Sequence, residues 1–174
     1  MYDVGSVPRD AETKVAERPG DHVAGLRLWL RLLTCTTMIE DEVRRRLREQ
    51  FDTTLPRFDV LAQLDKMPDG MTLGELSQRM MVTNGNVTGL IDRLVAEGLI
   101  ARRALPKDRR VQIVKLTAAG RRTFRGMARA NGNWISDIFA DLDANDIEAL
   151  MQLLAKTKAS AGKAIAAGEP NGRR

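Results

Sequence analysis

The segment Thr72–Thr117 decides the fold: TLGELSQRMMVTNGNVTGLIDRLVAEGLIARRALPKDRRVQIVKLT. A short helix is expected to start at Thr72, because Thr72 and Glu75 have the spacing of a capping box. After a tight turn, a second helix is expected from a cap at Thr83 to Gly98, a residue typical of helix ends. Two helices joined in this way indicate a helix-turn-helix.

The start and outer face of the second predicted helix carry polar side chains suited to reading bases. Asparagine can pair with adenine through two hydrogen bonds, and threonine can contact a thymine methyl group or a phosphate. The alternative is that these side chains merely decorate a solvated helix start. The candidate DNA contacts are Thr83, Asn84, Asn86, Thr88 and Arg93.

A basic hairpin follows this helix. Residues 99–104 and 111–116 have strand composition with partial alternation, and residues 105–110 between them hold a proline and a charge cluster. Such a tip should project from the body, where arginine suits a narrow minor groove or phosphates. An ordinary solvated turn is the alternative. The candidate contacts are Lys107, Asp108, Arg109 and Arg110.

Positive charge is concentrated around this hairpin. Nine Lys or Arg and one Asp lie between Leu99 and Arg125, a balance of +8 in a chain whose total is +5, so the remainder is −3. Phosphate binding requires a local concentration of this kind, whereas general solubility does not. The sequence therefore predicts a mainly α protein with a small β-hairpin wing that binds double-stranded DNA.

The wing also carries a family signature. Asp108, Arg110, Leu116 and Thr117 fit D-x-R-x-x-x-x-x-L-T, which resembles the wing motif of MarR-type regulators. The resemblance covers residues 22–166 and implies a winged-helix homodimer on a pseudo-palindromic operator, usually a repressor released by a small ligand. It further implies that Asp108 supports Arg110, which enters the minor groove.

The rest of the chain divides around this module. Residues 1–20 are expected to be a disordered arm, 53–117 the winged helix-turn-helix domain, and 167–174 a disordered tail. By the family resemblance, residues 21–52 and 118–166 form a helical dimerisation region. The helix expected at about 22–50 is apolar nearly all round in its first half, which suits a subunit interface on one side; ordinary core burial is the alternative.

Arginines cluster in the second half of that helix and at the start of the next one. A solvated helix face explains such a run, and two functional alternatives remain open: further DNA phosphate contacts, or a cradle for an anionic ligand such as the phosphates of coenzyme A. The arginines concerned are Arg44, Arg45, Arg46, Arg48 and Arg57.

A finer resemblance concerns the effector. The segments 29–40, 55–71 and 81–100 look like the MarR branch that controls hydroxycinnamate and related aromatic-acid catabolism, where several members respond to an aromatic acyl-CoA thioester. It implies an aromatic acyl-CoA or aromatic acid as effector, bound between the first, second and fifth helices. The side chains implied near the aryl group are Trp29, Met38, Phe58 and Leu61, with the arginines named above at the phosphates.

Several classes of function are not expected. The chain has one histidine, one cysteine and no phosphate-cradling glycine loop, so we expect no enzyme, metal site or cofactor. Without a secretory segment or long apolar span, we expect a cytoplasmic protein with no membrane partner. Cys35 is expected to be a small buried hydrophobe, with a redox switch as the rival hypothesis. A winged-helix protein without any small ligand is the third hypothesis.

Overall fold

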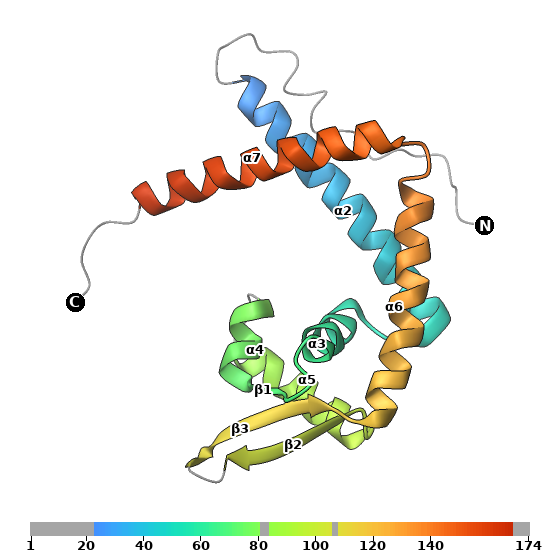
Figure 1. Cartoon of the computed structure of the whole chain (residues 1–174), viewed down its shortest axis with the longest axis vertical. Helices are drawn as coiled ribbons and strands as arrows, with labels where there is room; N and C mark the ends of the chain where they lie inside the picture. Colours follow the sequence, from blue (N-terminus) through green and yellow to red (C-terminus); the bar gives the residue numbers. More distant parts are fainter. Residues whose placement is uncertain (1–22, 81–83, 106–107, 169–174) are drawn as a thin grey trace. The chain divides into compact units, whose positions relative to one another are not determined.

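A computed structural model describes residues 23–80, 84–105 and 108–168 of the chain, so the predicted arm, Thr83 and Lys107 lie outside the described residues. The described residues up to Gly132 form one compact unit, and those from Asn133 onward form a second. The elements, labelled in Figure 1, are α2 (Val23–Phe51), α3 (Leu55–Asp65), β1 (Met71–Thr72), α4 (Leu73–Met80), α5 (Asn84–Ala96), β2 (Ile100–Leu105), β3 (Asp108–Leu116), α6 (Ala118–Ile138) and α7 (Ala144–Gly168). The predicted class, mainly α with a small wing, is confirmed.

Local capping signals set the helix starts. The Glu75 carboxylate accepts a hydrogen bond from the backbone N–H of Thr72 at 2.7 Å, and the Thr72 hydroxyl accepts one from the N–H of Glu75 at 3.2 Å. At the start of α7, Asp143 accepts from the N–H of Asp146 at 2.9 Å, and Asp146 accepts from the N–H of Asp143 at 3.2 Å. Both are reciprocal capping boxes, so the two helix starts follow from local sequence.

The sheet has three antiparallel strands in the order β1-β3-β2, one more than the predicted hairpin. Met71 of β1 pairs with Val114 of β3, and Ile100 of β2 pairs with Leu116. A two-residue strand is too short to show a period-two pattern, which is why β1 was missed. β3 also begins three residues earlier than predicted. Residues 108–110, expected in the turn, therefore belong to the strand.

The core of the first unit lies between α3, α4, α5 and the sheet. Val87, Ile91 and Leu94 of α5, which recur at helical spacing, are almost fully buried. The second half of α2 joins this core through Val43 and Leu47. α2 therefore belongs to the same compact unit as the predicted winged helix-turn-helix.

Large apolar side chains remain exposed on two helices. On the first half of α2 they are Leu26, Leu28, Trp29 and Leu33, and on α7 they are Ile147, Leu150, Met151, Leu153, Leu154 and Ile165. Cys35 is exposed as well, so the expectation that it is buried is wrong for the single chain. The side chains that bury Val43 and Leu47 in the second half of α2 do not cover its first half.

The end of α7 differs from the prediction. The helix runs to Gly168, two residues into the segment expected to be a disordered tail, because the alanines at 164, 166 and 167 are strong helix formers. Residues 169–174 lie outside the described part. None of the helices within the described ranges is both long enough and apolar enough to cross a lipid bilayer.

Candidate nucleic-acid interface

α5 presents two different faces. Val87, Ile91 and Leu94 point into the core, while Asp92 and Arg93 are exposed. Of the other predicted contacts, Thr88 is half-buried, and Asn84 and Asn86 occupy the first turn of the helix with side chains outside what the structure describes. The helix is thus anchored along one side and leaves its outer side available.

The hairpin of β2 and β3 is the second element of the interface. Asp108, Arg109 and Arg110 form the start of β3, and their side chains are not among those described. In Figure 1 the closed end of the hairpin points away from the start of α6. Arg103, an exposed β2 residue in register with Ile113, adds a cation that the sequence analysis did not single out. The strand composition placed Arg103 in a strand but did not show on which face of the sheet its side chain lies.

Ion pairs link α5 to its neighbours. The Asp92 carboxylate lies 2.8 Å from the Arg102 guanidinium of β2, and the Glu97 carboxylate after α5 pairs with Arg57 of α3. Exposed ion pairs contribute about 0–1 kcal/mol each, so their main effect is on geometry. They help to fix the positions of the hairpin and of α3 relative to α5.

The end of α5 is closed by backbone hydrogen bonds. Gly98 has φ +73, its N–H donates to the Val95 carbonyl at 2.9 Å, and the Leu99 N–H donates to the Leu94 carbonyl at 3.0 Å. This pair of bonds is the Schellman pattern, which requires the left-handed conformation that glycine adopts at little cost. The predicted stop of the helix at Gly98 is confirmed.

The start of α6 lies directly against this turn. The Thr117 hydroxyl donates to the Gly98 carbonyl at 2.7 Å and accepts from the Gly120 N–H at 3.0 Å. A Cβ atom on Gly120 would lie only 2.0 Å from the Leu99 carbonyl oxygen. Thr117 of the family signature therefore joins the wing, the end of α5 and the start of α6.

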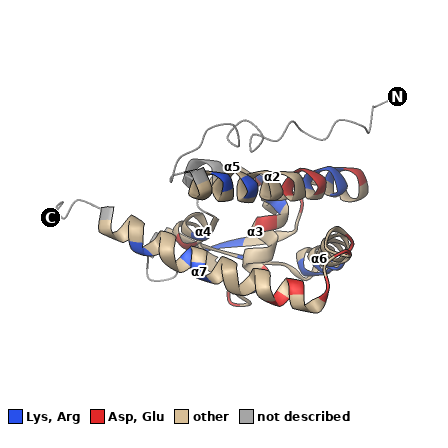
Figure 2. Ribbon diagram, turned by 90° about the horizontal axis from the view of Figure 1, so that it is seen from above, with Lys and Arg blue, Asp and Glu red and all other residues tan. Residues whose placement is uncertain are grey.

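The α2 arginines are engaged within their own helix. Arg44 pairs with Glu40, Arg45 with Glu42 and Glu49, and Arg46 with Glu42. Hydrogen bonds from Arg45 and Arg46 lower the pKa of Glu42 to about 2. Figure 2 shows acidic and basic residues side by side along α2. This arrangement favours a solvated, internally paired helix face, on which Arg48 is also exposed.

The residues implied near the aryl group are not gathered in one pocket of the single chain. Trp29 and Met38 are more than half exposed on α2, whereas Phe58 is buried and its ring centroid lies 5.5 Å from that of Phe124. Leu61 is buried and lines a pocket together with Arg57. Two of the nine predicted ligand contacts thus share a site.

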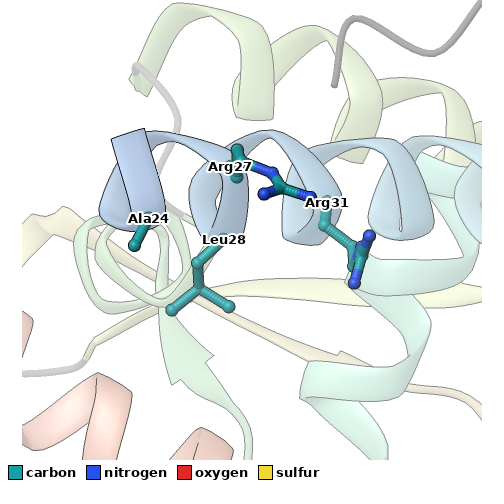
Figure 3. Close-up of a pocket in the computed structure, with 4 residues that line it drawn as sticks. All are labelled: Ala24, Arg27, Leu28 and Arg31. Atoms are coloured by element: carbon teal, nitrogen blue, oxygen red, sulfur yellow. The ribbon is translucent and has the colours of Figure 1, made fainter. Parts of the chain in front are cut away.

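That pocket, of about 330 Å³, lies between the α2–α3 junction, the end of α5 and α6. Glu97, Leu99, Thr123 and Met127 line it and were missed, because the whole lining comes from three separate parts of the chain and forms no sequence motif. A second pocket of about 250 Å³, shown in Figure 3, contains none of the predicted residues; its described lining is Ala24, Arg27, Leu28 and Arg31 of α2. The described ranges contain no group of three or more acidic, His or Cys residues arranged to hold a metal ion.

Comparisons with known proteins agree with this geometry. The model of the MarR family matches residues 53–111, which span the helix-turn-helix and the start of β3. The chain is 30% identical over 142 residues to the HTH-type transcriptional regulator YsmB of Bacillus subtilis, covering 82% of this chain and 94% of that protein. It is 29% identical over 133 residues to the transcriptional activatory protein BadR of Rhodopseudomonas palustris, covering 75% of each.

A solved structure shares both fold and sequence. A cysteine-to-serine mutant of MarR from E. coli, complexed with operator DNA, superposes with a TM-score of 0.63 at 28% identity, covering 72% of this chain and 92% of that one. The matched proteins are transcriptional regulators and not enzymes. With its anchored α5, basic hairpin and wing signature, this chain belongs to the MarR family and is a DNA-binding transcriptional regulator.

Proposed function

We propose that the chain acts as a homodimeric repressor of an aromatic-acid catabolic operon of the hydroxycinnamate type, released by an aromatic acid or its acyl-CoA thioester. The observation that carries the DNA-binding part is the pairing of α5, anchored on one face only, with a hairpin whose second strand opens on Asp108, Arg109 and Arg110. Such a helix enters a major groove while the wing follows the backbone into the adjacent minor groove.

In this proposal the two elements have different tasks. Asn84 and Asn86 in the first turn of α5 read base edges, together with Thr88 and Arg93 of the same helix and with Thr83, which precedes it in the sequence. Arg110, oriented by Asp108, enters the minor groove, and Lys107 and Arg109 contact phosphates. The operator complex of the related E. coli MarR supports this assignment by similarity.

The homodimer is supported by the exposed apolar side chains of α2 and α7. Leu153 and Met151 of α7 are 60% and 62% exposed, and Trp29 of α2 is 57% exposed. Each of the two helices carries several such side chains, and exposed apolar patches are rare on monomers and mark association sites. A two-fold dimer presents two copies of α5, which fit successive major grooves when they lie about 34–36 Å apart.

Ligand release follows from thermodynamic linkage. A ligand that prefers a dimer with the wrong spacing of the two α5 helices must weaken DNA binding by the factor by which DNA weakens ligand binding. A 100-fold release requires only about 2.7 kcal/mol of coupling. The finer family resemblance and the pocket beside Arg57 and Leu61 support an aromatic effector.

A second candidate is an activator of the same type of operon. It is favoured by the similarity to BadR, a transcriptional activatory protein. Repressor and activator bind DNA in the same way, so binding data alone do not separate them. Transcription in vitro from the promoter beside the operator does: added protein lowers the transcript level for a repressor and raises it for an activator.

The primary test is fluorescence anisotropy on the DNA upstream of this protein's own gene, with and without p-coumaroyl-CoA, coenzyme A and p-coumarate. Tight binding released by the thioester or the free acid, and not by coenzyme A, supports the proposal. Tight binding that none of them releases overturns the aromatic effector. Cys35→Ser is the control for oxidation: an oxidant that releases DNA from the wild type and not from this variant would favour a redox switch.

Two variants test the wing. Arg110→Ala should weaken operator binding and reduce the slope of log affinity against log salt by about 1, because one cation that displaces condensed counterions from the groove is lost. Lys158→Ala, which removes the same charge from α7, should leave that slope unchanged because the proposed DNA contacts come from α5 and the wing. Equal slopes for the two variants would show that Arg110 makes no electrostatic contact with the DNA.

A further inference from the structure

Not all of the positive charge around the hairpin belongs to the hairpin itself. Three of the nine cations between Leu99 and Arg125 lie on α6, and a fourth arginine follows them on the same helix. At about 3.6 residues per turn, the four side chains fall within an arc of about 100° and span about 12 Å of the helix. This α6 arginine stripe consists of Arg121, Arg122, Arg125 and Arg129, of which the last three are exposed.

The stripe is not neutralised within its own helix. Along α2 the arginines pair with glutamates three or four residues away. α6 contains a single acidic residue, Asp137, which lies eight residues beyond Arg129. Arg121 lies 3.5 Å from Asp65 of α3, and the other three arginines form no ion pair with a described residue. Because like charges four residues apart weaken a helix, the stripe is not explained by the stability of α6.

The surroundings of the stripe select the kind of partner. The opposite side of α6 is buried through Phe124 and Met127, and the exposed residues beside the stripe are Ala118 and Gly126. None of the large apolar side chains that are exposed in the described part of the chain lies on α6. Protein interfaces and membranes use such side chains as anchors, whereas a phosphate backbone is held by cations alone. The face therefore fits the backbone of a nucleic acid.

The stripe and the proposed operator contacts belong to opposite ends of α5. The start of α6 lies against the end of α5, where Thr117 donates to the Gly98 carbonyl. The proposed base readers are in the first turn of α5, which has 13 residues and is therefore about 20 Å long. The closed end of the hairpin also points away from the start of α6 (Figure 1). Since DNA has a persistence length of about 150 bp, one duplex does not readily reach both places.

We propose that the α6 arginine stripe binds the phosphate backbone of a second DNA duplex while α5 and the wing hold the operator. The proposal rests on the proposed function, because the assignment of α5 and the wing to the operator is what leaves the stripe for another duplex. Phosphate contacts read no bases. The protein therefore joins its operator to neighbouring DNA of any sequence.

The test is fluorescence anisotropy of the full chain with two DNA duplexes that carry different dyes. One is the operator, trimmed to its two half-sites, and the other is a short duplex of random sequence. With the operator at saturation, the wild type should bind the random duplex with a Kd of about 10⁻⁴–10⁻⁶ M at near-physiological salt, and the operator should stay bound. Random DNA that binds only by releasing the operator overturns the proposal, because one DNA site then accounts for all binding.

A triple variant removes the stripe and keeps side chains that favour a helix. Binding of the random duplex should weaken by about tenfold or more, and its slope of log affinity against log salt should fall by about 2.7, since each phosphate contact contributes about 0.9. Operator affinity should stay unchanged. Random-duplex binding equal to that of the wild type overturns the proposal. The substitutions are Arg122→Gln, Arg125→Gln and Arg129→Gln.

The matched control removes the same charge from exposed positions of α7 and should leave binding of the random duplex intact. An equal loss in the control would mean that net charge alone is responsible, which overturns the proposal. Sedimentation of the stripe variant is the second control, because dissociation of the dimer would assign the stripe to a subunit contact instead. The control substitutions are Lys156→Gln, Lys158→Gln and Lys163→Gln.

Two competitors test the other classes of partner. Poly-glutamate and phosphatidylglycerol vesicles are added at the same total anionic charge as unlabelled random duplex. We expect the duplex to displace its labelled copy best. Better displacement by poly-glutamate would assign the stripe to an acidic protein, and better displacement by vesicles would assign it to a membrane; either result overturns the proposal.

The same titrations separate this inference from the proposed function. Operator binding by the wild type is read from the operator dye alone. If the operator is not bound, but the stripe variant still loses the random duplex, the proposed function fails and the phosphate contact of the stripe remains. If the operator is bound and the stripe variant keeps the random duplex, only the second DNA site fails.

Discussion

The winged body and α7 use apolar residues in opposite ways. In the body, Leu94 of α5 and Leu64 of α3 are completely buried, so the module closes its own core. In α7, Leu153 and Met151 are about 60% exposed, although the helix repeats its apolar residues at the same spacing. The same helical spacing of apolar residues therefore gives a buried core in one region and an exposed apolar face in the other.

The largest effect is expected from Leu94→Ala. It leaves a cavity in a close-packed core, so the free energy of unfolding should fall by about 2–5 kcal/mol. Urea denaturation measures this loss. Sedimentation under native conditions should report the same association state as for the wild type, because Leu94 is buried in the core. A loss below about 0.5 kcal/mol would mean that the body does not close its own core.

The same substitution in the other region, Leu153→Ala, should act on association instead. If the α7 face is covered by a second copy, truncating it weakens the dimer by about 1.5–3 kcal/mol per protomer. Analytical ultracentrifugation across a dilution series measures the change. A dissociation constant equal to that of the wild type would remove Leu153 from the interface.

A third variant concerns the close contact at the start of α6. Gly120→Ala places a Cβ atom 2.0 Å from the Leu99 carbonyl oxygen, so we expect a loss of about 1–2 kcal/mol despite the better helix propensity of alanine. Gly126→Ala in the same helix is the matched control. No described atom lies within 4 Å of its added methyl group, so that variant should gain up to about 1 kcal/mol. Thermal unfolding measures the stability of both variants. Equal shifts in melting temperature would contradict the close contact at Gly120.

A smaller effect is expected at the start of α4. Thr72→Ala removes the hydroxyl that accepts from the Glu75 N–H, which should cost about 1 kcal/mol. Because that bond caps the first helix of the helix-turn-helix, amide exchange in α4 should increase more than in α6. Uniform exchange across both helices would show that the cap stabilises the body as a whole.

The smallest effect is pH dependence from Glu42. Its pKa is lowered from 4.5 to about 2 in the fold, because Arg45 and Arg46 donate hydrogen bonds to it. The contribution of this carboxylate to stability is therefore present above pH 4.5 and is lost as the pH falls towards 2. Between pH 5 and pH 3, the free energy of unfolding of Glu42→Gln should fall less steeply than that of the wild type. Parallel curves would contradict the contribution of Glu42.

Local signals were the dependable part of the prediction. The capping box at Thr72 and the helix stop at Gly98 were both predicted correctly from the sequence. Each depends on groups within about four residues, so no distant contact can override it. The wing signature likewise led to the right family.

Long-range features were harder to predict. The pairing of β1 with β3, the Arg57–Glu97 ion pair and the pocket around it join residues that are far apart in sequence. The sequence left the α2 arginines open between a solvated face and two kinds of phosphate contact, and in the structure glutamates three or four residues away engage Arg44, Arg45 and Arg46. Sequence spacing allows that pairing without requiring it, because an exposed side chain has many rotamers.

The sequence by itself determined the helix starts, the polar outer side of the second helix of the motif, the basic wing and membership of the MarR family. Those properties reside in short-range hydrogen bonds and in the periodicity of apolar residues. Only the tertiary structure decided that Cys35 and Trp29 are exposed in the single chain and that Arg57 meets Glu97 beside a pocket. Burial and long-range ion pairs depend on which elements pack together, and that packing is settled by the whole fold.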